Sequence, residues 1–437
     1  MGANRRTFVQ QAGMLATGIT LAGFMPSALG EGLKFTNFRR TPVPQPFSGP
    51  EGEEDFWNWV KGSFTVSETP INLNNGGVSP QPKVVQDMHE KYLALCNEGP
   101  SYYMWRILDQ GREPLRAKLA GLAGCSPEEI AIDRNSTEAL NTIIFGMNLK
   151  AGDEVVLTKE DYPNMMHAWK QREKRDGIKL VWINIELPSE DDDYMVKQFT
   201  SAFTSRTKVV HITHMINWTG QLLPAKKIAQ KAHEKGIEVL VDGAHTFAHL
   251  DYNIPDLECD YFGASLHKWL CAPLGSGLMY IKKDKIKNIW PLLGDDKPED
   301  TDIRKFERSL GTRNFASEMA ISTAIDFHYA IGSKRKENRL RFLKNYWAEK
   351  VVGIPGVKLH TSLKPEYSCA LALFSIDGMT VAETESELLG KYKIHTSPIS
   401  FDFVQGVRVT PSIYTSTREL DILVHAIEDM AHAAKKQ

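Results

Sequence analysis

Cysteine is scarce in this sequence: five residues are scattered over 437 positions, with no C-x-x-C pair among them. A cysteine-based metal site normally needs ligands at short, regular spacing. The sequence therefore argues against such a site. We expect the thiols to be free or buried, with one reactive thiol as the alternative; they are Cys96, Cys125, Cys259, Cys271 and Cys369.

A charge excess of either sign is also missing. The 52 basic residues oppose 54 acidic ones, which gives a net charge of −2. Proteins that bind nucleic acid or anionic membranes normally carry a basic surface. We therefore expect neither partner, and a small neutral or zwitterionic molecule instead.

The apolar run near the N-terminus, from Ala12 to Phe24, is too short and too rich in Gly and Thr to span a bilayer well. It follows Asn4-Arg5-Arg6-Thr7-Phe8-Val9-Gln10, which resembles the twin-arginine export motif, and precedes small residues at Ser27-Ala28. We predict a signal peptide over residues 1–30, export to the periplasm or beyond, and no membrane segment in the mature form. The alternative is a chance Arg pair on an amphipathic first helix.

The rest of the chain divides into three predicted parts. Prolines and glycines over residues 31–75 indicate an extended arm, and residues 321–437 have the texture of a smaller α+β domain. Residues 76–320 alternate short β-rich runs with helical ones, which predicts an α/β fold with a mostly parallel seven-stranded sheet. The expected strands are 129–132, 154–157, 180–185, 209–213, 238–241, 261–264 and 277–281.

Two chemically matched side chains follow neighbouring strands of that sheet. Asp242 ends the run Val239-Leu240-Val241-Asp242, and Lys268 follows the next run in Ser265-Leu266-His267-Lys268. Ligands of such sheets bind at the carboxyl ends of strands. Pyridoxal 5′-phosphate (PLP) needs this pair, because an amine must form a Schiff base and a carboxylate must keep the ring nitrogen protonated. Either residue alone would be better explained as a turn or surface residue.

Two further motifs suit the same ligand. Ser136 and Thr137 open an apolar helix after a predicted strand, where backbone amides can bind a phosphate; a plain helix cap is the alternative. Tyr162 follows the next strand and could stack on a pyridine ring, or be an ordinary loop tyrosine.

Other α/β enzymes fit poorly. The chain has no G-x-G-x-x-G after the first strand, so a Rossmann dehydrogenase is disfavoured. A serine hydrolase would need G-x-S-x-G, and Gly263-Ala264-Ser265-Leu266-His267 fails at its last position.

Taken together, these motifs resemble the class V aminotransferase family of fold-type I PLP-dependent transferases, and most of all its isopenicillin N epimerase-like branch. The resemblance runs from Asn72 to the C-terminus. It implies that Lys268 and Asp242 are catalytic, and that His245 stands where the family usually has a glutamine near the ring hydroxyl. The implied cofactor-binding residues are Ser136, Thr137, Tyr162, Asn217, Asp242, His245, Ser265, His267, Lys268 and Thr312.

The resemblance also implies a substrate side and a partner subunit. Arg408 matches the arginine that binds the substrate carboxylate, although an edge-strand arginine is the alternative; Asn75 and Arg106 are further substrate-side candidates. Thr312, in Gly311-Thr312-Arg313, matches a segment that reaches the neighbouring subunit's phosphate, which implies a homodimer with shared active sites.

The expected function is a PLP-dependent transformation of an amino acid or an amino-acid-containing metabolite, by aminotransferase or isopenicillin N epimerase-like chemistry. Sulfur transfer is disfavoured, because Lys393-Ile394-His395-Thr396-Ser397-Pro398-Ile399 lacks the nucleophilic cysteine of cysteine desulfurases. A PLP-dependent lyase, an enzyme that tailors a peptide or siderophore, and a catalytically silent PLP-binding protein stay open as alternatives.

Overall fold

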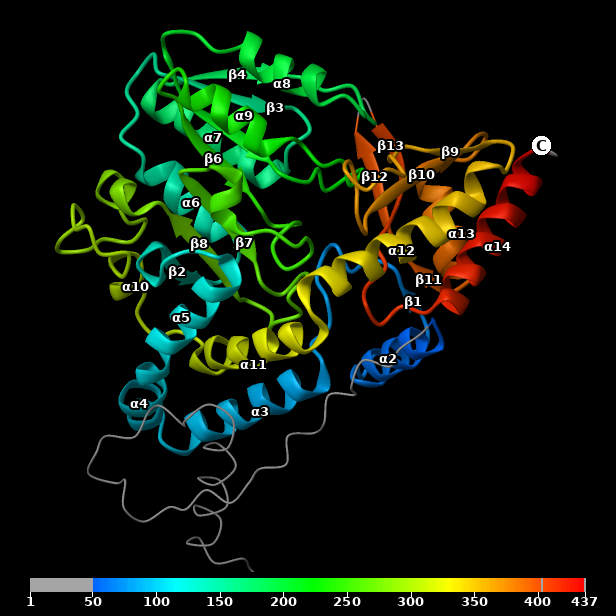
Figure 1. Ribbon diagram of the computed structural model, residues 1–437, viewed down its shortest axis with the longest axis horizontal. Coiled ribbons are helices and arrows are strands. Elements are labelled where there is room, and N and C mark those ends of the chain that lie inside the picture. The colour runs from blue at the N-terminus through cyan, green and yellow to red at the C-terminus, as the bar shows by residue number, and fades with distance from the viewer. Residues whose placement is uncertain (1–49, 402–403, 436–437) are drawn as a thin grey trace, which may run out of the picture.

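The computed structural model describes residues 50–401 and 404–435. The predicted signal peptide and the first part of the predicted arm, up to residue 49, lie outside the described residues. The described chain forms a large lobe, which holds the main sheet, and a smaller lobe at the C-terminal end (Figure 1).

The large lobe is built on a seven-stranded sheet with the order β2-β8-β7-β6-β5-β3-β4. All its neighbouring strands run parallel except at β8, which is antiparallel to both β2 and β7. The predicted mostly parallel seven-stranded α/β sheet is therefore confirmed. The strands are β2 (Ile130–Asp133), β3 (Glu154–Thr158), β4 (Lys179–Ile183), β5 (Thr207–Thr213), β6 (Glu238–Asp242), β7 (Tyr261–Ser265) and β8 (Gly277–Ile281).

Successive residues of these strands enter two different hydrophobic clusters, because a strand directs neighbouring side chains to opposite faces. Val155 and Val209 join α6 and α7 in one cluster, whereas Val156 and Val210 join α5, α8, α9 and α11 in the other. Both faces of the sheet are thus covered and its strands are nearly all apolar. The helices of this lobe are α3 (Lys83–Glu98), α4 (Pro100–Tyr102), α5 (Arg112–Ala123), α6 (Ser136–Gly146), α7 (Pro163–Asp176), α8 (Asp192–Ser201), α9 (Ala225–His233), α10 (Lys305–Arg308) and α11 (Phe315–Ile331).

The small lobe has an antiparallel sheet of order β12-β13-β10-β9 against three helices. The chain passes from the large lobe to the small lobe between two helices. α11 lies along α3 in Figure 1 and packs in the large lobe, whereas the apolar side chains of α12 join the small-lobe cluster. Its elements are α12 (Ser333–Val352), β9 (Val357–Leu359), β10 (Ala372–Ile376), α13 (Val381–Gly390), β11 (Ile394–His395), β12 (Ser397–Phe401), β13 (Val404–Val409) and α14 (Thr417–Ala434).

An N-terminal segment belongs structurally to this small lobe. β1 (Ile71–Asn72) pairs in parallel with β11, and Asn74 forms a bridge with Thr410. The chain then crosses to the large lobe, where the Ser79 N–H donates to the carbonyl of His267.

We expected residues 31–75 to form an extended arm, but residues 50–62 form a helix, α2 (Pro50–Gly62). Phe56, Trp57 and Val60 of this helix are buried in a cluster with Trp269 and Tyr414. Pro42, Pro44 and Pro46 precede this helix and Pro50 is its first residue, where proline is tolerated, whereas the apolar residues of the helix provide one side to bury.

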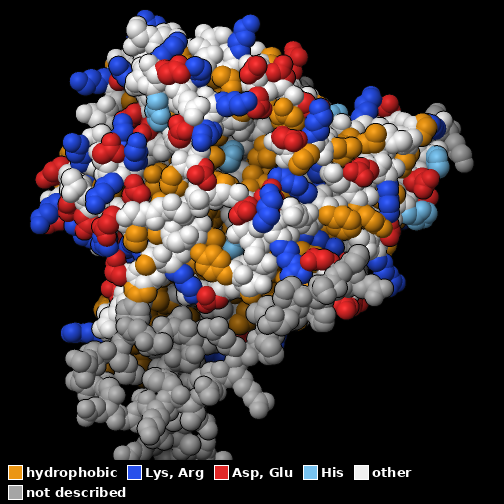
Figure 2. Space-filling view, in the orientation of Figure 1, with side chains coloured by type: hydrophobic (Ala, Val, Ile, Leu, Met, Phe, Trp, Pro, Cys, Tyr) orange, Lys and Arg blue, Asp and Glu red, His pale blue; other side chains and the backbone are white. Residues whose placement is uncertain are grey.

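The described surface shows basic and acidic side chains mixed over the face seen in Figure 2. No helix among residues 50–401 and 404–435 has the length and apolar character needed to cross a bilayer.

Candidate active site

A cavity of about 770 Å³ lies where strand ends of the large sheet face β12 and β13 of the small lobe. Most of the predicted site residues line it: Ser136, Thr137, Tyr162, Asn217, Asp242, His245, Ser265, His267, Lys268 and Arg408. Residues from both lobes therefore enclose one space.

Asp242 and Lys268 share this cavity, as the sequence predicted. Asp242 is the last residue of β6 and is 5% exposed, and its Oδ1 accepts a hydrogen bond of 2.8 Å from the N–H of Ala244. Burial raises the pKa of Asp242 to about 6 and lowers the pKa of Lys268 to about 8. Each group also stabilises the other's charge. The amine is consequently closer to its nucleophilic neutral form than an ordinary lysine.

His245 lies against this amine. Its Nε2 is 3.1 Å from Lys268 Nζ, and burial, aided by the charge of Lys268, holds the pKa of His245 well below its usual value. A neutral imidazole can accept a hydrogen bond from the ammonium at Nε2.

The N-terminus of α6 forms one end of the cavity. The N–H of Ser136 donates to Ser265 Oγ at 2.9 Å, and Ser265 Oγ in turn donates to Ser136 Oγ at 3.0 Å. A Cβ on Gly277 would lie 2.6 Å from the backbone nitrogen of Asn135, so the β8 backbone approaches this turn as only glycine allows. His267 donates from Nδ1 to the carbonyl of Ser276 at 3.1 Å, which leaves its Nε2 for another partner. Hydroxyls, amides and an imidazole therefore converge where a phosphate could bind.

Arg408, which also lines the cavity, is a buried cation on β13. It is 6% exposed, and it donates to the carbonyl of Asn217 at 2.7 Å and to Asn74 Oδ1 at 3.0 Å. Burial lowers its pKa to about 10, so the guanidinium is charged at neutral pH. Over the described ranges its Nε has no hydrogen-bond partner. A buried, charged guanidinium with free donor capacity suits a carboxylate.

Three predicted site residues, Asn75, Arg106 and Thr312, do not line this cavity. The Asn75 side chain is buried and bonded to Tyr414 and Thr410. Arg106, in the π-helical turn Tyr103–Ile107, and Thr312, before α11, are exposed.

Sequence reasoning missed several residues of the cavity wall. Within the loop 72–77, which the resemblance places on the substrate side, Asn74 and Gly76 line the cavity rather than Asn75. Trp218, which was not predicted, stacks on Phe401 with ring centroids 3.9 Å apart. Trp218 directly follows a predicted site residue, but the register of β12 beside it could not be read from the sequence.

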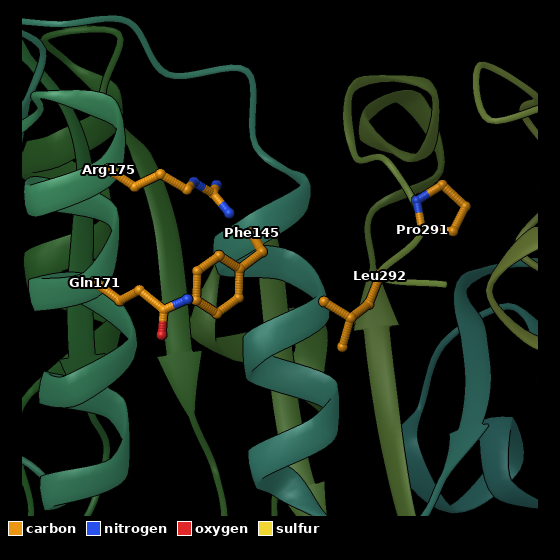
Figure 3. A pocket seen from close by; sticks show the side chains of 5 residues that line it. All are labelled: Phe145, Gln171, Arg175, Pro291 and Leu292. Atoms are coloured by element: carbon orange, nitrogen blue, oxygen red, sulfur yellow. The ribbon is translucent and has the colours of Figure 1, made fainter. Parts of the chain in front are cut away.

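A second cavity, of about 270 Å³, lies between α6, α7 and the segment after β8 (Figure 3). Phe145, Gln171, Arg175, Pro291 and Leu292 line it, and the guanidinium of Arg175 lies over the Phe145 ring at 5.2 Å. It brings together no acid–base pair like that of the first cavity.

Comparison with known proteins identifies the relatives of this chain. The family described as aminotransferase class-V matches residues 71–398. Isopenicillin N epimerases from Streptomyces clavuligerus and Amycolatopsis lactamdurans are 26% and 28% identical, each over 85% of this chain and 98% of their own length. A cysteine desulfurase from Haloferax volcanii is 24% identical over 84% of this chain and 91% of its own.

Solved structures agree on the fold. A variant of C-DES with glycine covalently linked to its PLP cofactor superimposes with a TM-score of 0.76 at 21% identity, covering 84% of this chain and 99% of its own. The cysteine desulfurase CsdA from Escherichia coli gives a TM-score of 0.75 at 21% identity, covering 86% and 98%. The fold is that of fold-type I PLP enzymes, and the cofactor is PLP.

The residues in the cavity fit this cofactor. Within residues 50–401 and 404–435, three buried polar atoms that belong to cavity-lining residues, Asn217 Oδ1, His245 Nδ1 and Arg408 Nε, have no hydrogen-bond partner. Buried polar groups are normally paired, so these atoms point to a polar ligand. Lys268 would hold the cofactor, Asp242 would face its ring nitrogen, and the α6 N-terminus would take its phosphate.

Proposed function

Because the chain belongs to the class V aminotransferase family of PLP-dependent enzymes, we propose that it acts on the amine-bearing carbon of an amino acid or of a metabolite that contains one. The reaction is transamination or epimerisation of the isopenicillin N type, and both begin with removal of the proton from that carbon. The observation that carries this proposal is the single cavity that holds Lys268, Asp242 and Arg408.

The chain's own groups support such proton removal. PLP, when bound, withdraws electrons from the carbon next to the substrate amine. The Lys268 amine, whose pKa burial lowers to about 8, can take up the proton in its neutral form, and His245 Nε2 at 3.1 Å can accept a hydrogen bond from the ammonium that results. The Asp242 carboxylate supplies the negative charge that keeps the ring nitrogen protonated.

Arg408 would orient the substrate. Its guanidinium binds the substrate carboxylate, and its bonds to Asn74 and the carbonyl of Asn217 fix its direction. A carboxylate held there and an amine held near Lys268 define an α-amino acid.

The five cysteines do not provide a thiol suited to sulfur transfer. All five cysteines are buried or half-buried, and burial raises the pKa of Cys125 and of Cys369 to about 12. A nucleophilic cysteine needs a low pKa and access to substrate. The β11–β12 segment, 394–401, contains none.

The test is to incubate the purified PLP-loaded protein with a panel of D- and L-amino acids in deuterated water. Deuterium at the Cα carbon without oxo acid supports epimerisation, and one equivalent of oxo acid supports transamination. Repeated release of oxo acid with ammonia would instead establish a lyase, and no change with any member would favour a silent PLP-binding protein.

We further propose that the protein is exported by the twin-arginine route. The motif around Arg5 and Arg6 supports it, and an exported enzyme would meet secreted peptides and siderophores, whose amino-acid groups belong in the substrate panel. Replacing both arginines with lysine should leave the protein in the cytoplasm of a host with an active twin-arginine system. Unchanged export would contradict the proposal.

We also propose a homodimer. Thr312 is exposed, and it follows Gly311, which has a positive φ of 69° in the turn before α11. From that position it would complete the phosphate site of a second copy. We expect light scattering to give the mass of a dimer. Thr312→Val should bind PLP more weakly while the dimer stays intact. A monomer that binds PLP fully would refute the homodimer.

A further inference from the structure

A second buried carboxylate lies beside Asp242. Asp161 follows β3, His211 is in β5 and Asp242 ends β6, so three adjacent strands bring them together. One ligand atom of each lies within 4.8 Å of the others, and all three side chains are buried. Of the three, Asp242 lines the cavity.

The hydrogen bonds define the tautomer of His211. Trp169 Nε1 donates to His211 Nδ1 at 2.8 Å. Indole nitrogen is only a donor, so Nδ1 carries no proton and the neutral ring is protonated on Nε2. Burial lowers the pKa of His211 to about 4, so the ring is neutral at pH 7. Nε2 would have to lose its proton to bind a metal ion, and the cluster is therefore better suited to hydrogen bonding than to coordination.

Asp161 is surrounded by donors. Its Oδ1 accepts from Thr213 Oγ1 at 2.5 Å and from the N–H of Tyr162 at 2.6 Å, and its Oδ2 lies 3.4 Å from His211 Nε2. Burial raises the pKa of Asp161 to about 6, which these donors oppose, so the group is ionised above that pH. Its charge is felt at Asp242, where it is the second cause, after burial, of the raised pKa.

We propose that Asp161, acting through His211, is a positioning residue that keeps the ring nitrogen of bound PLP protonated. The negative charge of Asp161 disfavours the ionised form of the nearby Asp242. For the same reason it must favour a cation that lies beside Asp242. The pyridinium thus faces two carboxylates instead of one. The groups that face Asp242 are Asp161 and His211 on the protein side and Lys268 in the cavity.

The proposal rests on the pairing of Asp242 with the ring nitrogen, and the experiment separates the two. The protein is loaded with PLP labelled with ¹⁵N in the ring, and the ¹⁵N chemical shift is followed from pH 6 to pH 10 in the wild type and in Asp161→Asn. The midpoint for loss of the ring proton should fall by about one pH unit or more in the variant.

Glu160→Gln is the matched control. Glu160 is the neighbouring residue, is 0% exposed and also carries a pKa raised by burial, to about 7, but it is not among the groups that act on Asp242. Its ¹⁵N midpoint should equal that of the wild type. An equal shift in both variants would reduce Asp161 to a general structural role and overturn the proposal.

Two further variants remove ambiguity. If Asp161→Asn fails to fold, Thr213→Val, which removes one donor to Asp161, should lower the midpoint in the same direction. If the ¹⁵N midpoint shifts in Asp242→Asn but in neither Asp161→Asn nor Thr213→Val, the role of Asp161 is refuted and the pairing of Asp242 with the ring nitrogen stands. No shift in Asp242→Asn would refute the underlying pairing, and a stoichiometric metal ion in the purified protein would replace this proposal with a metal site.

Discussion

Nε2 of His245 lies 3.1 Å from Nζ of Lys268, inside a cavity that the buried Arg408 also lines. The imidazole is neutral, so it accepts a hydrogen bond from the ammonium and thereby favours the charged amine. Burial of Lys268 acts in the opposite direction, and it wins, because the pKa of Lys268 falls to about 8.

Lys268→Ala should abolish activity and remove the visible absorbance of lysine-bound PLP. Among the described residues that line the cavity, Lys268 is the one lysine, so no other amine there can replace the lost bond. The measurement is an absorbance spectrum after reconstitution, alongside a thermal melt to verify folding. Full turnover in this variant would end the assignment of Lys268.

The rate at which the cofactor-free protein takes up PLP should rise about tenfold per pH unit below pH 8 and level off above it. The neutral amine is the reacting form, and its fraction grows until pH exceeds the pKa of Lys268, about 8. His245→Leu removes an acceptor for the ammonium and should move the midpoint down by about one unit. His245→Gln keeps an acceptor and should leave it nearly unchanged; identical profiles for both variants would contradict this role.

Arg408→Lys should lower kcat/KM for an amino acid by about 100-fold, or about 2.7 kcal/mol, with PLP affinity unchanged. Lysine keeps the charge but loses the planar fork that binds a carboxylate in two places. For an amino-acid amide, which lacks the carboxylate, kcat/KM should fall far less in Arg408→Lys. A loss of the same size for both substrates would argue against carboxylate binding.

Asp242→Asn should stabilise the cofactor-free protein increasingly as pH rises from 4 to 7, while weakening PLP binding. Burial raises the pKa of this carboxyl from 3.8 to about 6 in the folded state. Below pH 4 the wild-type carboxyl is protonated and costs no stability. As pH rises through 6 the buried carboxylate destabilises the folded wild type, by about 3 kcal/mol at most. The difference in melting temperature between variant and wild type, recorded against pH, is the measurement; a constant difference would contradict it.

Glu307→Gln should cost about 3–5 kcal/mol of unfolding free energy, because it breaks a buried charge network. Glu307 accepts hydrogen bonds from Arg116 at 2.8 Å and from the N–H of Ile132 at 2.6 Å, forms an ion pair with Arg112 at 2.9 Å, and is 2% exposed. Urea unfolding measures the loss. Asp87→Asn, at the exposed pair with Lys83, should cost less than about 1 kcal/mol and serves as the control.

The large sheet was predictable because its strands are buried on both faces and appear as short apolar runs. The predicted strand 277–281 coincides with β8, and Asp242 and Ser265 prove to be the last residues of β6 and β7. Strand ends of a parallel sheet meet at one edge, so the joint position of Asp242 and Lys268 in one cavity followed from order along the chain.

Other features depend on register and packing that no local pattern contains. His211 is a buried polar residue of β5, and only the order β6-β5-β3 brings it close to the carboxylates of Asp242 and Asp161. Asn74 reaches Arg408 through a contact between residues far apart in the sequence. The helix α2 was missed because the prolines before it outweighed the apolar side of Phe56, Trp57 and Val60.

The parallel pairing of β1 with β11 has a mechanical consequence. Asn74 is fastened to the small lobe through Thr410 and through Arg408, whereas Ser79 is fastened to His267 in the large lobe. The N–H of Gly76 is also bonded to Thr410 Oγ1, so Gly77 and Val78 are what separates the two attachments. A rotation of the small lobe would therefore move Asn74 and Arg408 together, and it would have to break the bond from Arg408 to the carbonyl of Asn217 in the large lobe.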